Sequence, residues 1–311
     1  MAQPRRTGGS GVRTYPAGPC TEDRAHHAEG PVWDHTRSEL IWVDVYRGLI
    51  HSARWNPRAR ELHLERTYHA GQAVAAVVPC TDAGQGWIVA TEFGFSRLRS
   101  DGTFQTLTEP ERERQPATRM NDGKCDPRGR FWAGSMAHDR TPGAGTLHCL
   151  AGDVSTPVLE QVTISNGMAW TGPDEFLYID TPTQRVDRLR VAADGRIAAQ
   201  ETAFVIAPGA GAPDGMTIDQ EGCVWIAMWG AGAVLRFTQS GEVVGRIDLP
   251  AQQVSSCCFG GPDLQTLFIT TSQEDYSPRR IAEEPDAGRL FAADVDIPGR
   301  PADFYVSGVA S

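Results

Sequence analysis

Short apolar segments follow tight polar turns along most of this chain. One example is the turn Asp219–Gly222, which precedes an apolar run over residues 224–228. Residues 185–191 and 233–237 alternate apolar and polar side chains with β-branched and aromatic residues, which predicts strands. A sustained 3.6-residue period, typical of a long helix, is not seen. Two polar segments, 109–115 and 278–285, are predicted to be loops or short helices.

The unit of turn and strand occurs six times. The second residue of the turn falls at positions 34, 81, 126, 171, 219 and 260, so the steps are 47, 45, 45, 48 and 41 residues. Each unit continues with an alternating strand and a Gly-containing hairpin turn, as at 100–102 and 239–241. A period near 45 is typical of propeller blades with four antiparallel strands each. We therefore predict an all-β, six-bladed β-propeller, with an open β-sandwich array as the alternative.

The two ends of a closed ring must come together to protect the sheet edges. We expect residues 12–16 to add an N-terminal strand to the last blade, which would also contain residues 289–295. Residues 1–18 are rich in Arg, Gly and Pro and lack the apolar central region of a signal peptide. We interpret them as a disordered tail that precedes a single propeller domain over residues 19–311.

Three polar residues stand at matching places in the repeats. Glu29, Asn166 and Asp214 are each followed by Gly and lie five or fewer residues ahead of the repeated turn. Residues at the start of the innermost strands can point into the central channel, so we expect these three to meet there. Two carboxylates and an amide oxygen suit Ca²⁺, Mg²⁺ or Mn²⁺, with Zn²⁺ or Fe²⁺ also possible. Singly, each residue is more typical of a turn or strand cap; the matching positions favour a metal site.

The third repeat adds further candidates. Arg119 can fork two hydrogen bonds to a carboxylate or to sugar hydroxyls, and Asn121 offers both a donor and an acceptor. Asp122 suits a ligand, a turn former or a base, and the alternative is a solvated loop. Asp139 follows the next strand and is expected to reach the same mouth, where His138 could carry a proton.

Composition narrows the possible partners and compartment. The net charge of −10 argues against nucleic acid and anionic membrane as partners. Seven cysteines without a CxxC pair indicate free thiols in a reducing compartment, and we expect a cytoplasmic protein that is a monomer or weak homodimer. No apolar run approaches the ~20 residues that span a bilayer. The chain also lacks the GxSxG and HExxH motifs of other hydrolases.

Several separate segments resemble the SMP-30/gluconolactonase/regucalcin (LRE-like) family, in family order. They are Ala28–Trp33, Arg119–Met136, Ser165–Trp170, Pro213–Gly215 and Cys257–Gly261, and they extend over about residues 25–298. The resemblance implies a six-bladed propeller with one divalent metal in its channel, held by Glu29, Asn166 and Asp214. It also implies that Asp214 is the general base and that Arg119 and Asn121 bind substrate. The family often has Glu where Asp139 stands here, which leaves the substrate preference open.

The function that these features favour is metal-dependent hydrolysis of a sugar lactone to the aldonic acid, with a small-molecule lactone as the partner. The metal would polarise the carbonyl and activate water, and Asp214 or a neighbouring carboxylate would accept the proton. One alternative is another enzyme at the same site: a hydrolase of a different lactone, ester or phosphotriester, or a cyclase or isomerase. A second alternative is a non-enzymatic metal-binding scaffold. Arg119 beside the metal ligands favours an enzyme, because a storage site needs no sugar-holding Arg.

Overall fold

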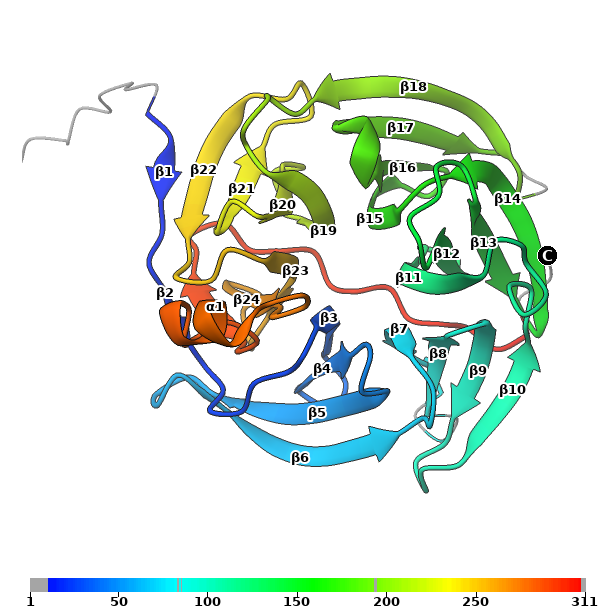
Figure 1. Ribbon diagram of the computed structural model, residues 1–311, viewed down its shortest axis with the longest axis horizontal. Coiled ribbons are helices and arrows are strands. Elements are labelled where there is room, and N and C mark those ends of the chain that lie inside the picture. Colours follow the sequence, from blue (N-terminus) through cyan, green and yellow to red (C-terminus); the bar gives the residue numbers. More distant parts are fainter. Residues whose placement is uncertain (1–10, 83, 85, 193–194, 309–311) are drawn as a thin grey trace, which may run out of the picture.

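Six antiparallel blades of four strands stand around a central axis, and the fifth blade gains a short parallel strand, β1 (Arg13–Thr14), at its outer edge, as the computed structural model in Figure 1 shows. It describes residues 11–308 except 83, 85, 193 and 194. The predicted six-bladed propeller is confirmed, and the open sandwich array is not the fold. The innermost strands of the six blades are β3, β7, β11, β15, β19 and β23.

Each blade is a meander of neighbouring strands. The first three blades contain β3 (Ala28–Asp34), β4 (Glu39–Asp44), β5 (Leu49–Asn56) and β6 (Glu61–His69); β7 (Val74–Pro79), β8 (Trp87–Thr91), β9 (Gly94–Leu98) and β10 (Phe104–Thr108); and β11 (Thr118–Cys125), β12 (Phe131–Ala137), β13 (Gly145–Ala151) and β14 (Val154–Val162). The last three contain β15 (Ser165–Gly172), β16 (Glu175–Asp180), β17 (Arg185–Val191) and β18 (Ile197–Val205); β19 (Ala212–Ile218), β20 (Val224–Trp229), β21 (Ala233–Phe237) and β22 (Val243–Asp248); and β23 (Val254–Gly260), β24 (Thr266–Thr271) and β25 (Phe291–Asp294) with β2 (Ala17–Pro19). The two described helices are the 3₁₀ turn η2 (Thr181–Thr183) and α1 (Pro278–Glu283), so the segment 278–285, predicted to be a loop or a short helix, contains a short helix.

The apolar core is divided among the six blade junctions. Each junction has its own cluster of buried residues drawn from two adjacent sheets; Trp132 and Trp170, for example, join the third blade to the fourth. The cluster between the sixth and first blades includes Phe268 and Trp33, whose rings stack 6.0 Å apart. This last junction closes the ring, because both faces of every sheet must be covered by a neighbour.

The repeated turns are held by buried aspartates. Asp126 accepts hydrogen bonds from the Trp132 indole at 2.9 Å and from Arg130 Nε at 2.6 Å. Asp219 accepts from the Trp225 indole at 3.0 Å and from Arg236 Nε at 2.7 Å. Both carboxylates are fully buried, so the turns found in the sequence pattern are fastened by the same contact in two blades.

The N-terminal segment does complete the sixth blade, but with residues 17–19 and not with residues 12–16. β1 (Arg13–Thr14) pairs in parallel with β22 of the fifth blade, and β2 pairs with β25 to complete the sixth. The prediction that residues 12–16 complete the last blade is therefore wrong, because Tyr15 packs between these two blades, 5.5 Å from Trp225. Within the tail expected over residues 1–18, β1 and the first residues of β2 are paired strands, and residues 1–10 lie outside the described part.

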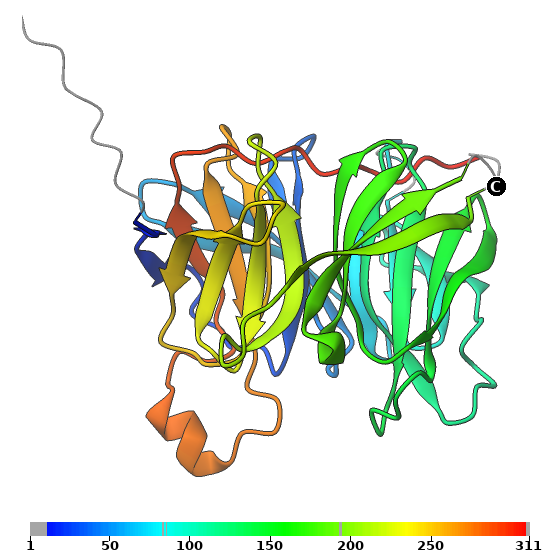
Figure 2. The ribbon, with the colours of Figure 1, turned by 90° about the horizontal axis from the view of Figure 1, so that it is seen from above.

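The propeller has two different faces (Figure 2). On one face the innermost strands begin, and α1 lies there. On the other, the chain after β25 crosses the end of the channel: Gly299 N–H bonds to Leu264 at 2.8 Å and Tyr305 N–H to Pro79 at 2.9 Å. All seven cysteines lie in the described part as free thiols, six of them buried. Across the described ranges, the helices are too short and too polar to traverse a membrane.

Candidate active site

Every innermost strand has a register shift near its start. The shifts lie at 29–32, 74–76, 120–122, 165–168, 213–216 and 254–256. A β-bulge bends its strand and re-aims a side chain. Six equivalent bulges therefore surround one end of the channel, and the identity of the residue at each bulge decides what the channel mouth can bind.

The three predicted metal ligands occupy three of these bulges. Glu29, Asn166 and Asp214 are 4%, 4% and 8% exposed. Asn166 Nδ2 donates to Thr181 Oγ1 at 2.9 Å, and Thr181 Oγ1 donates to the Pro213 carbonyl at 2.8 Å. The fourth and fifth blades are thus tied together at the site, so Asn166 and Asp214 are held in a fixed relation.

The carboxylates at the channel mouth repel one another. Burial, followed by the charges of Asp214 and Asp122, raises the pKa of Glu29 well above its ordinary value. Burial and the charge of Asp122 raise the pKa of Asp214 in the same direction. Burial also raises the pKa of Asp122, although the Lys124 ammonium opposes this. Uncompensated negative charge in a buried site is costly, and a cation placed there would relieve it.

The donor set fits a divalent metal ion. Asn166 Oδ1 is buried and has no hydrogen-bond partner, which is unusual for an amide oxygen in a protein interior. Within the described residues, no three His, Cys, Asp or Glu side chains are placed to hold a metal by themselves. A metal at this mouth would therefore use the amide oxygen of Asn166 together with the carboxylates of Glu29 and Asp214, a hard-oxygen set.

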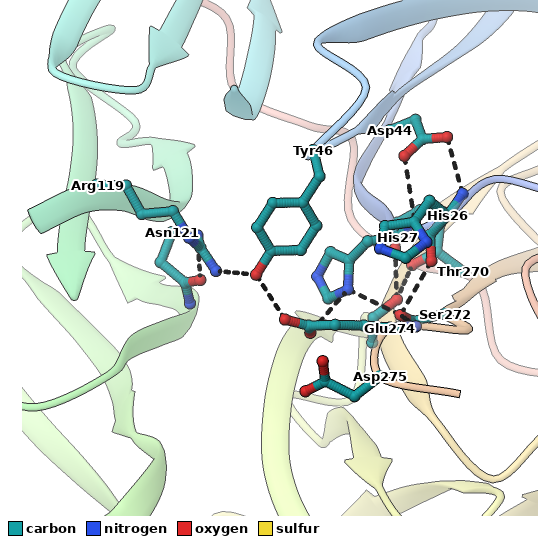
Figure 3. Close-up of polar contacts among 12 residues, drawn as sticks. His26, His27, Asp44, Tyr46, Arg119, Asn121, Thr270, Ser272, Glu274 and Asp275 are labelled. Atoms are coloured by element: carbon teal, nitrogen blue, oxygen red, sulfur yellow. Dashed lines mark hydrogen bonds and ion pairs between the residues drawn. The ribbon is translucent and has the colours of Figure 1, made fainter. Parts of the chain in front are cut away.

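Arg119 and Asn121 lie at the same mouth and belong to a polar chain that spans three blades (Figure 3). Arg119 Nη1 donates to Asn121 Oδ1 at 2.9 Å, and Arg119 Nη2 donates to Tyr46 Oη at 3.0 Å. Tyr46 Oη donates to Glu274 Oε1 at 2.6 Å. His27 lies within 3.4 Å of the other Glu274 oxygen, and burial, followed by the charge of Arg119, lowers the pKa of His27 to about 3. His27 is thus a neutral member of the chain at physiological pH.

Asp122, whose charge acts on Glu29 and Asp214, also lines a cavity of about 500 Å³. The cavity is lined by the inner strands and by residues 300–303 of the crossing C-terminal segment. Lys124 also lines it and donates to the Met216 carbonyl at 2.6 Å. Glu29, Asn166 and Asp214 do not line this cavity, so the candidate metal ligands are separate from it. The cavity lies on the side of the propeller that the C-terminal segment crosses.

Asp139, which was also predicted to reach the mouth, has its carboxylate engaged in a local turn. It is exposed and accepts hydrogen bonds from its own turn, at 3.0 Å from Thr141 N and 2.7 Å from Thr141 Oγ1. His138 is also exposed and lies 3.7 Å from Glu92. Sequence reasoning missed Tyr46 and Glu274, which stand in loops without a repeat pattern. His27, which directly precedes the Ala28–Trp33 motif, was the one member of this polar chain outside Arg119 and Asn121 that the sequence could have suggested.

The fold and the mouth define a six-bladed propeller with an oxygen-rich, acidic site at one end of its channel. The model of the SMP-30/gluconolactonase/LRE-like region matches residues 27–273, and the chain belongs to this family, as its motifs predicted. Regucalcin of Danio rerio is 35% identical over 85% of this chain and 88% of its own length. A 6-deoxy-6-sulfogluconolactonase of Pseudomonas putida is 32% identical over 87% and 92%. The solved regucalcin of Agrobacterium tumefaciens, titled a calcium-binding protein, shares the fold with a TM-score of 0.85 at 24% identity, over 94% of this chain and 99% of its own.

Proposed function

We propose that this protein is a metal-dependent lactonase that opens a sugar lactone to the aldonic acid. The observation that carries the proposal is the buried, partnerless Asn166 Oδ1 beside the repelling carboxylates of Glu29 and Asp214, with Arg119 and Asn121 at the same mouth. Membership in the family supports it, as does the name of the Pseudomonas putida relative, a gluconolactonase of a sulfonated sugar.

Glu29, Asn166 and Asp214 would hold a divalent cation, which supplies Lewis acidity when bound. Arg119 and Asn121 bind the sugar hydroxyls and orient the ring ester. The Asp214 carboxylate accepts a proton from the attacking water, whose oxygen bonds to the acyl carbon. The ring C–O bond then breaks, and the proton passes to the leaving ring oxygen, so water is consumed and one carboxylic acid and one hydroxyl form.

The test is a lactone panel in a pH-stat, with metal analysis of the purified protein. We expect acid release from an aldonolactone that stops after chelation and returns with a divalent cation. Asp214→Asn should lower kcat by about 10²- to 10⁴-fold without unfolding the protein. The exposed Asp263→Asn, in the loop between β23 and β24, is the matched control and should leave kcat unchanged.

Other outcomes point to other functions. Turnover of an organophosphate or simple ester in place of lactones would assign a different hydrolase to the same site. Metal binding without turnover of any substrate would identify a metal-binding scaffold and refute the lactonase proposal. Equal rates for Asp214→Asn and wild type would refute the role of Asp214.

A further inference from the structure

Glu274 is an acidic side chain at the mouth that the proposed chemistry does not use. It stands in the loop between β24 and α1, 228 positions from Tyr46 along the chain. Tyr46 Oη donates to Glu274 at 2.6 Å and accepts from Arg119 at 3.0 Å. The sixth blade therefore reaches the substrate-holding Arg of the third blade through a tyrosine of the first (Figure 3).

The loop that carries Glu274 is itself fastened. Glu274 N–H donates to Ser272 Oγ at 2.9 Å, and Ser272 Oγ donates to the His26 carbonyl at 3.3 Å. Ser272 Oγ also lies 2.8 Å from His27 Nδ1, and because its own hydrogen goes to His26, the contact is best satisfied with His27 as the donor. The Glu274 side chain is only 16% exposed, so it is a fixed group and not a flexible surface acid.

This chain of contacts presets the Arg119 guanidinium. Nη1 donates to the Met120 carbonyl and to Asn121 Oδ1, both at 2.9 Å, and Nη2 donates to Tyr46. Arg has five N–H donors, so these three partners among the described residues leave two for a ligand. The guanidinium also lies over the Tyr46 ring, 5.2 Å from its centre. A guanidinium ordered before binding loses less entropy when a ligand arrives.

The same loop makes the mouth unfavourable for anions. Arg140, the cation beside it, is 3.9 Å from Glu274 and 3.6 Å from Asp275, so its charge is already offset. Glu274 and Arg119 share the Tyr46 hydroxyl, so a phosphate, sulfonate or carboxylate bound at Arg119 would be repelled by the Glu274 carboxylate, whereas a neutral hydroxyl would not. We propose that Glu274 is a positioning and specificity residue: through Tyr46 it orients Arg119, and its charge selects uncharged sugar lactones over anionic ones. This inference rests on the proposed lactonase function.

The charge is tested with gluconolactone and its 6-phosphate as paired substrates. Glu274→Gln keeps an acceptor for Tyr46 but removes the charge, so we expect kcat/KM for the phosphorylated lactone to rise by about three- to ten-fold relative to the neutral one. Added salt should shrink this gain, an effect that a purely structural role would not produce. Asp275→Asn is the matched control: this neighbouring acid is 80% exposed in its ion pair with Arg140, so we expect less than about a two-fold change.

Positioning is tested with Glu274→Ala and Tyr46→Phe. Both break the link to Arg119, and Phe retains the ring beneath the guanidinium. We expect KM for the neutral lactone to rise by about ten-fold or more in each, with a smaller change in kcat. Glu274→Gln should rescue most of the loss in KM. Calorimetric binding of the unreactive gluconolactam should rank the variants in the same order.

The outcomes separate this inference from the proposed function. If wild type and the variants bind the lactam in the expected order but wild type hydrolyses no lactone, the lactonase function is refuted and the positioning role of Glu274 stands. An active wild type that prefers the phosphorylated lactone overturns the inference about Glu274 and leaves the lactonase intact. Equal kcat/KM values for wild type, Glu274→Ala and Tyr46→Phe would also overturn the inference about Glu274 and leave the lactonase proposal intact.

Discussion

Gly167→Ala should disturb the candidate site by forcing two innermost strands apart. A Cβ at Gly167 would lie 2.6 Å from the Asp214 carbonyl oxygen and 2.9 Å from Met216 N. Both are backbone atoms that cannot rotate away, and overpacking of this kind costs about 1–3 kcal/mol. The glycine directly follows Asn166, so the strain falls on two predicted metal ligands at once.

The size of the effect can be worked out for both stability and turnover. An unfolding entropy of about 2.1 cal/mol/K per residue gives ~0.65 kcal/mol/K for 311 residues, so Tm should fall by about 2–5 °C. A displacement of reacting groups by about 1 Å costs roughly 100-fold in rate. We expect kcat for an aldonolactone to drop far more than the loss of stability explains, together with weaker binding of a divalent cation by calorimetry.

Gly172→Ala is the control, because Gly172 lies on the same strand and a Cβ there meets nothing within 4 Å. It should leave Tm, metal binding and kcat close to wild type. If Gly167→Ala matched Gly172→Ala in all three measurements, β15 and β19 could not be as tightly apposed as the structure has them, and the reasoning would be refuted.

Two further predictions concern buried carboxylates outside the mouth. Asp219→Ala leaves the buried Arg236 with only the exposed carboxylate of Glu221 as an ion-pair partner and removes the acceptor of the Trp225 indole. It should lower the urea unfolding free energy by about 3–5 kcal/mol, while the exposed Asp263→Ala should change it by less than about 0.5 kcal/mol. Burial alone would raise the pKa of Glu111, but hydrogen bonds from His148 and Thr118 outweigh it and lower that pKa below 4.5. Its stabilising contribution is therefore complete above that value and lost as the pH falls through the folded-state pKa. Glu111→Gln should be less stable than wild type at pH 7, and the difference in unfolding free energy should shrink as the pH falls below 4.5 and through the folded-state pKa; a difference that persists in stronger acid would contradict this.

Much of the fold was predictable because it is written in local patterns. The turn residues Asp126 and Asp219 recur with the blades. Each is followed six residues later by a Trp whose indole N–H donates a hydrogen bond to its carboxylate. We predicted correctly that an N-terminal strand completes the last blade, but we assigned it to residues 12–16. The correct residues, 17–19, follow Tyr15, which fills a gap between the fifth and sixth blades. That gap exists only after the ring has formed.

Some residues of the candidate site could be predicted from local sequence patterns and others could not. Glu29, Asn166 and Asp214 were predicted because repeat symmetry places them at equivalent strand positions, and Arg119 was predicted from its hydrogen-bonding chemistry. Asp139 was expected at the mouth from its nearness in sequence, yet two hydrogen bonds from Thr141 hold its carboxylate in its own turn. Competition between a local turn and a distant site is settled by side-chain geometry, which a linear pattern does not contain.

The sequence by itself determined the number of blades, the strand pattern, the family and the oxygen-rich residues at the strand starts, since all of these follow from periodicity and residue chemistry. Only the tertiary structure decided which side chains share the mouth. Tyr46 and Glu274 meet Arg119 because ring closure brings the first, third and sixth blades to one axis. Contacts across a ring depend on the distances among all its blades, and no stretch of neighbouring residues carries that information.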